Sequence, residues 1–175
     1  MQPHQPFVLG FAAYSGTGKT SLLKKLIPRL QDRGLRIGVI KHSHHDFEID
    51  YPGKDSYELR MAGANVMLIA SPYRSALIQE HRPPKAVCLR DQLSILANEA
   101  LDLILVEGFR HEACKKIELH RPSLGNPLLY PADPDIIAVA SDTAMPDVHQ
   151  LPLLDLNNPD AIVDFIFHLL TETQP

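Results

Sequence analysis

A short run near the amino terminus has the residue types that bind a phosphate chain. Residues 13–20, Ala-Tyr-Ser-Gly-Thr-Gly-Lys-Thr, match the phosphate-binding loop pattern, with alanine in place of its first glycine. Small residues let backbone N–H groups turn inward around a β-phosphate at the positive end of a helix. Lys19 is expected to reach the β- and γ-phosphates, and Thr20 to offer its hydroxyl to Mg²⁺. The predicted nucleotide-binding residues are Ser15, Gly16, Thr17, Gly18, Lys19, Thr20 and Ser21.

The segments on either side are suited to hold this loop. Residues 7–12 form a short apolar run typical of a buried parallel strand. After the loop, residues 22–30 carry leucine and isoleucine at helical spacing, and Gly34 ends that pattern. Pro28 lies inside the pattern and predicts a kink or a short break. Residues 36–41 follow as a second strand, so the opening resembles a βαβ unit.

A second acid is expected near the loop, because Mg²⁺ bound to a phosphate chain is usually also held by a carboxylate through water. Glu107 is the candidate, since it ends the apolar run 103–106 and precedes Gly108. The alternative is an exposed acid at a strand end. Lys19 and Glu107 are therefore the predicted catalytic pair. Asp102 begins the same strand and is interpreted as structural.

The polar loop that follows the second strand should also face the site, because ligands bind at the carboxyl ends of strands in open α/β sheets. Asp46 is predicted to touch Mg²⁺ or its waters, and Lys41 could reach phosphate. His42, His44 and His45 permit a transition-metal site, although no thiolate or recognised spacing accompanies them. A polar loop with incidental histidines is the plainer interpretation.

The rest of the chain alternates strands and helices. Asp55 is a possible cap of a short helix over 55–62, and Asn158 with Pro159 marks the start of a terminal helix. The pattern predicts an α/β, three-layer sandwich around a mainly parallel sheet, with a β-hairpin insertion, as one domain over residues 1–175. The remaining predicted elements are a hairpin of strands 66–70 and 75–79, a helix over 89–97, and strands 116–120 and 136–140.

Composition narrows the class of protein. A net charge of −4 over 175 residues is unlike that of a generally basic nucleic-acid binder. No apolar run approaches the roughly 20 residues that span a bilayer. Residues 1–6 lack the features of a signal peptide, and the two isolated cysteines suit reduced thiols. We therefore expect a cytoplasmic protein that binds neither nucleic acid nor membrane.

Four blocks together resemble one family, molybdopterin-guanine dinucleotide biosynthesis protein B (MobB). The blocks with KHSHHD and PGKDSYELR are more specific than the phosphate-binding loop alone. The proline-rich stretches 72–92 and 121–134 diverge. The blocks, in chain order, are AAYSGTGKTSLLKKLIP, IGVIKHSHHDFEIDYPGKDSYELRMAGA, LDLILVEGFRHE and IIAVASD.

The resemblance implies the P-loop NTPase fold, GTP and Mg²⁺ as ligands, weak GTP hydrolysis and a homodimer. It also implies an accessory role beside the MobA-type guanylyltransferase that joins GMP to molybdopterin. The Asn-Lys-x-Asp guanine signature is missing. Asp142, after the strand 136–140, is the candidate to accept hydrogen bonds from guanine, and a turn cap is the equal alternative. No pattern identifies an arginine finger, which fits slow hydrolysis.

Two other functions remain open. A small-molecule kinase would hold an acceptor hydroxyl in the loop 42–60, with Asp46 as the base. A GTPase metallochaperone for another metal would use His42, His44 and His45 as ligands.

Overall fold

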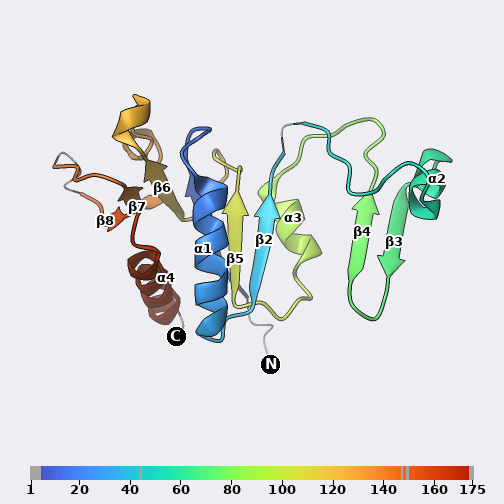
Figure 1. The fold of residues 1–175 in the computed structure, drawn as a ribbon, viewed down its shortest axis with the longest axis horizontal. Coiled ribbons are helices and arrows are strands. Elements are labelled where there is room, and N and C mark those ends of the chain that lie inside the picture. Colours follow the sequence, from blue (N-terminus) through green and yellow to red (C-terminus); the bar gives the residue numbers. More distant parts are fainter. Residues whose placement is uncertain (1–4, 44, 147, 149, 174–175) are drawn as a thin grey trace. The chain divides into compact units, whose positions relative to one another are not determined.

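A six-stranded sheet in which all neighbouring strands are parallel forms the centre of the first of two compact units (Figure 1). The computed structural model describes residues 5–43, 45–146, 148 and 150–173. The strand order is β2-β5-β1-β6-β7-β8, which puts β1 inside the sheet. The strands are β1 (Phe7–Ala12), β2 (Ile37–Lys41), β5 (Leu103–Glu107), β6 (Lys116–His120), β7 (Ile136–Ser141) and β8 (Leu153–Asp155).

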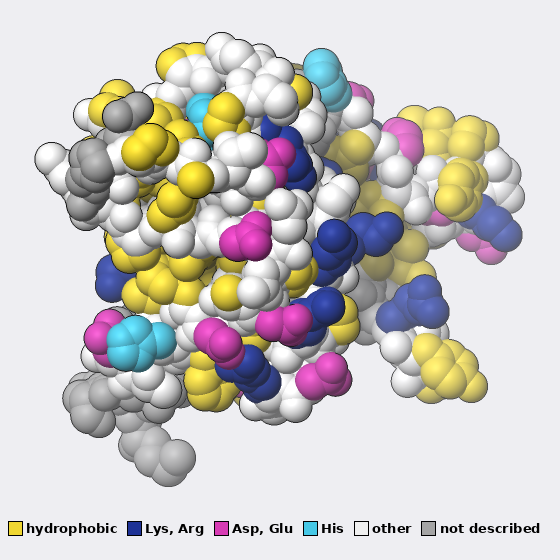
Figure 2. Space-filling model, turned by 60° about the vertical axis from the view of Figure 1, so that its left-hand side comes forward, with side chains coloured by type: hydrophobic (Ala, Val, Ile, Leu, Met, Phe, Trp, Pro, Cys, Tyr) yellow, Lys and Arg dark blue, Asp and Glu magenta, His cyan; other side chains and the backbone are white. Residues whose placement is uncertain are grey.

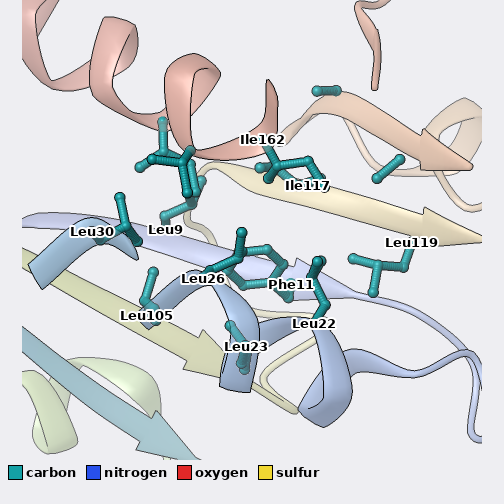
Figure 3. Close-up of a cluster of buried hydrophobic side chains, with 14 of the residues drawn as sticks. Leu9, Phe11, Leu22, Leu23, Leu26, Leu30, Leu105, Ile117, Leu119 and Ile162 are labelled. Carbon is teal, nitrogen blue, oxygen red and sulfur yellow. The ribbon is translucent and has the colours of Figure 1, made fainter. Parts of the chain in front are cut away.

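Helices cover both faces of this sheet, because its strands are apolar on both sides. On one face α1 (Lys19–Asp32) and α4 (Pro159–Thr173) pack over the strands. Figure 3 shows Leu22 and Leu26 of α1 beside Phe11 of β1 in this core. On the other face α3 (Leu89–Ile95) packs against Ile104 and Val106. The expected three-layer α/β arrangement is confirmed.

Pro28 does not break α1, contrary to one of the expected outcomes. The helix runs unbroken to Asp32 with Pro28 inside it. Proline removes only one backbone hydrogen bond, whereas Leu22, Leu26 and Leu30 bury a continuous stripe against the sheet. The packing of that stripe outweighs the local defect.

The predicted start of α4 is confirmed. The Asn158 side-chain oxygen accepts the backbone N–H of Ala161 at 3.2 Å, as an N-cap residue does. Across the helix pair, Arg29 Nε of α1 donates to Asp160 Oδ1 of α4 at 2.9 Å. Figure 2 shows acidic and basic side chains interspersed on the surface that it presents.

Residues 43–87 form the second compact unit. It holds α2 (Asp55–Met61) and the antiparallel hairpin of β3 (Val66–Ala70) and β4 (Ser75–Gln79), as predicted. Asp55 is not the cap residue: it is the first residue of α2, after Lys54, where the helix dipole favours a carboxylate. The hairpin is a separate two-stranded sheet, which confirms the insertion. One domain over residues 1–175 stays a prediction.

The helices of the described ranges are each too short or too polar to cross a bilayer.

A buried carboxylate holds the segment that joins β6 to β7. The Glu118 side chain is only 1% exposed, and it accepts the backbone N–H groups of Leu129 and Tyr130 at 2.8 and 2.9 Å. These bonds fix the start of the 3₁₀ turn Tyr130–Ala132; a second such turn covers Pro122–Leu124. His120 Nδ1 lies 4.0 Å from Glu118 Oε1.

The burial of Glu118 predicts a pH dependence of stability. Desolvation raises the pKa of the Glu118 carboxyl, so the folded chain holds this proton more readily than the unfolded chain. Between the ordinary pKa and the raised one, lowering the pH therefore stabilises the fold. Relative to Glu118→Gln, which does not titrate, wild type should gain stability as the pH falls from about 8 to about 5. Urea unfolding of both proteins across this range checks it, and a constant difference would contradict it.

Candidate nucleotide-binding site

The predicted phosphate-binding loop links the end of β1 to the first turn of α1. Gly18 has φ +102°, a conformation that favours glycine, and the helix begins at the next residue. The buried Thr17 hydroxyl donates to the Tyr14 carbonyl at 2.9 Å and braces the loop from within. Ser15, Gly16, Thr20 and Ser21, by contrast, are exposed. The loop thus has a fixed inner side and an accessible outer side.

The Lys19 ammonium folds back over this loop. Its Nζ donates to the carbonyls of Ala13 at 3.0 Å and Tyr14 at 3.2 Å. Partial burial lowers the pKa of Lys19, the negative charge of Glu107 opposes that effect, and the positive charge of Lys41 adds to it. An anionic phosphate would give the ammonium stronger, charge-assisted hydrogen bonds than two neutral carbonyls do.

Thr20 and Glu107 come together although they are 87 residues apart in sequence. The Thr20 hydroxyl donates to Glu107 Oε1 at 3.1 Å, because β1 and β5 are neighbours and Phe11 is paired with Glu107. Lys41 Nζ lies 3.7 Å from Glu107 Oε2. A hydroxyl beside a carboxylate fits the hard oxygen ligands of Mg²⁺, which keeps several of its waters. Their roles toward nucleotide and Mg²⁺ remain predictions.

The chain after Glu107 passes close to the end of β2. Gly108 has φ +98°, and a Cβ there would lie 2.9 Å from the His42 carbonyl oxygen. His42 N–H donates to the Glu107 carbonyl at 2.8 Å, and its ring stacks on Phe109 at 4.7 Å. Only glycine allows this approach, which fixes the backbone that carries Glu107.

The predicted metal contact of Asp46 stays a prediction, because Asp46 belongs to the second unit. Its Oδ1 accepts the backbone N–H of Phe47 at 3.0 Å. His44 lies outside the described residues. Within the ranges that the structure describes, no group of three His, Cys, Asp or Glu side chains is placed to hold a metal ion.

Asp142 lies directly after β7, at the edge of the sheet where the phosphate-binding loop also lies. Its Oδ2 accepts a hydrogen bond from Arg121 Nη1 at 2.5 Å, and Arg121 Nε donates to the Thr17 carbonyl at 2.9 Å. A second cation, Arg110, lies over the Tyr14 ring at 5.0 Å. Sequence reasoning assigned neither arginine, since no motif marks them; both follow strand ends on either side of β1.

Comparison with known protein families shows to which family the chain belongs. The family model described as MobB, "Molybdopterin guanine dinucleotide synthesis protein B", matches residues 8–142. The chain belongs to the MobB family. That assignment confirms the resemblance of the four sequence blocks, and the matched residues include the phosphate-binding loop, Glu107 and Asp142.

Curated MobB relatives match the chain over almost its whole length. The chain is similar to the "Molybdopterin-guanine dinucleotide biosynthesis adapter protein" of Escherichia coli (strain K12), with 50% identity over 91% of this chain and 90% of the relative. It is also similar to the protein of the same name from Haemophilus influenzae, with 44% identity over 91% and 86%. A crystal structure of a MobB homologue from Bacillus stearothermophilus shares the fold, with a TM-score of 0.69 at 22% identity, covering 94% of this chain and 98% of that chain.

Proposed function

We propose that this MobB-family protein is a GTP-binding adapter of molybdopterin guanine dinucleotide biosynthesis with weak GTPase activity. The observation that carries the nucleotide site is the pairing of Thr20 with Glu107 at 3.1 Å beside Lys19. Lys19 would bind the β- and γ-phosphates, and Thr20 and Glu107 would hold Mg²⁺. Mg²⁺, when bound, neutralises charge on the phosphates.

The preference for guanine is proposed to come from Asp142. A carboxylate can accept from both the ring N–H and the amino group of guanine, whereas adenine has no matching pair of donors on that edge. The adapter names of the curated relatives support a role beside a MobA-type guanylyltransferase and molybdopterin. Slow hydrolysis fits a protein whose nucleotide resets a conformation and supplies no group for transfer.

The test is a titration of the purified protein with GTP and with ATP, each with and without Mg²⁺, followed by a hydrolysis assay. Preferential GTP binding with turnover far below the common enzyme range of about 1–10³ per second supports the adapter function. Equal binding of both nucleotides, or a preference for ATP, would contradict it and favour the small-molecule kinase. Binding to the purified guanylyltransferase, measured with and without GTP, tests the partner.

We further propose that the protein is a homodimer joined through its hairpin. Val66, Leu68 and Leu77 point to one face of the two strands, since Leu68 is paired with Leu77, and they are 55%, 63% and 46% exposed. A two-stranded hairpin is marginally stable alone, and an apolar face of this kind is typical of an interface. A second copy of the chain can cover it with the same face.

Leu68→Asp is expected to turn the dimer into a monomer. In the dimer, the introduced carboxylate of this variant would be buried without a partner, which costs several kcal/mol. A loss of that size in binding free energy is enough to dissociate a dimer of ordinary affinity. Sedimentation velocity at about 10 µM, well above nanomolar dimer affinities, checks the mass. Leu124→Asp, at an exposed leucine of the first unit, is the matched control and should leave the mass unchanged. A Leu68→Asp dimer, or a monomeric wild type, would contradict the proposal.

A further inference from the structure

Arg121 links two parts of the proposed nucleotide site that the sequence keeps far apart. It directly follows β6, the strand that lies between β1 and β7. Its Nε donates to the Thr17 carbonyl of the phosphate-binding loop at 2.9 Å, and its Nη1 donates to Asp142 Oδ2 at 2.5 Å. A Cβ built on Gly18 would lie 3.9 Å from Arg121 Nη2. The guanidinium therefore lies against the loop and holds Asp142 at the same time.

The second carboxylate oxygen of Asp142, Oδ1, has an unusual environment. Oδ1 is buried and has no hydrogen-bond partner among the described residues, whereas Oδ2 is taken by Arg121. Leaving a buried acceptor unpaired is unfavourable, so native proteins rarely keep one without a reason. A donor from a ligand at this edge of the sheet would satisfy it.

We infer that Arg121 is a positioning residue for the nucleotide base: it ties the Thr17 carbonyl to Asp142 and orients that carboxylate. The inference rests on the proposed function, in which Asp142 accepts from guanine. It assigns to Arg121 a role that no motif in the chain marks. The free Oδ1 would accept from the 2-amino group of guanine, and Oδ2, which Arg121 holds at a fixed distance from the loop, keeps a second lone pair for the ring N–H.

Arginine suits this task better than lysine. Its planar fork presents separate N–H donors in a rigid geometry, so one side chain can satisfy the Thr17 carbonyl and Asp142 together. A lysine ammonium is a point charge on a flexible stem and would have to choose between the two acceptors.

The experiment compares GTP with ITP, which lacks only the 2-amino group of guanine. Dissociation constants are measured for wild type, Arg121→Ala, Arg121→Lys and Asp142→Ala, with Arg29→Ala as the control that removes another Arg–Asp pair of the same unit. We expect Arg121→Ala to reduce the GTP-over-ITP preference by about tenfold, the value of one hydrogen bond to a charged group. Arg121→Lys should recover part of it, and Arg29→Ala should behave as wild type.

The variants and the two nucleotides together distinguish a positioning role of Arg121 from a phosphate contact. Equal loss of GTP and ITP affinity in Arg121→Ala would show a phosphate contact and would overturn the inference, as would unchanged affinity for both. In the double variant Arg121→Ala, Asp142→Ala, the preference should fall no further than in Asp142→Ala alone; additive losses would also overturn the inference. If wild type itself does not prefer GTP over ATP, the proposed function fails first. Circular dichroism confirms that each variant is folded, and Arg121→Lys provides the test if Arg121→Ala is not.

Discussion

Lys19→Ala is expected to weaken GTP binding by about 2–5 kcal/mol, or roughly 30-fold to 5,000-fold in Kd. In the structure the ammonium is held by two carbonyls of its own loop, at 3.0 and 3.2 Å. A phosphate chain would replace these neutral acceptors with anionic ones, so Lys19 contributes most when nucleotide is present. Isothermal titration calorimetry with GTP measures the change.

Lys24→Ala is the matched control, because Lys24 is an exposed lysine of the same helix. It should bind GTP as wild type does. If the affinity of Lys19→Ala also equalled that of wild type, residues 13–20 would not be the nucleotide site. The proposed role of Thr20 in binding Mg²⁺ would then be wrong as well.

Glu107→Gln is expected to lower Mg²⁺-dependent GTP hydrolysis and Mg²⁺ affinity by about 10–100-fold, the usual cost of losing a group that orients metal ligands or waters. Binding of GTP in the presence of EDTA should be unchanged. Glutamine can still accept the Thr20 hydroxyl bond, now 3.1 Å long, but it has no negative charge for the ion or for Lys41. Hydrolysis and binding are measured over a Mg²⁺ titration.

The control for this substitution is Glu99→Gln, at an exposed glutamate of the same unit. It removes the same charge without touching the loop. Wild-type hydrolysis by Glu107→Gln would assign Glu107 a structural role. Loss of binding in EDTA would instead show that the carboxylate supports the loop itself.

Local pattern was sufficient for the elements that position the loop. The apolar run of β1, the stripe of α1 and the acid that ends β5 each lie within a few residues, and the structure has them at the predicted places. The hairpin was equally readable, since its two strands are separated by a short turn. Adjacent elements of a chain carry their own signal, so these predictions needed no knowledge of the sheet order.

Other features depend on which strands become neighbours. The three residues of β8 are too few for any periodicity and follow Pro152, so the strand was missed. Arg121 has no motif of its own; its meaning arises only when β1, β6 and β7 lie side by side. The short break that Pro28 would permit is absent for the opposite reason, because burial of the helix face outweighs the local loss of one hydrogen bond.

The position of β5 between β1 and β2 also has a consequence for synthesis. β1 and β2 do not pair with each other; both pair with β5, which begins 62 residues after β2 ends, with the second unit in between. At translation speeds of about 5–20 residues per second, roughly 3–12 seconds separate the two events on the ribosome. During that interval two apolar strands have unpaired edges, which makes the nascent chain a natural client for chaperones that cover exposed strands.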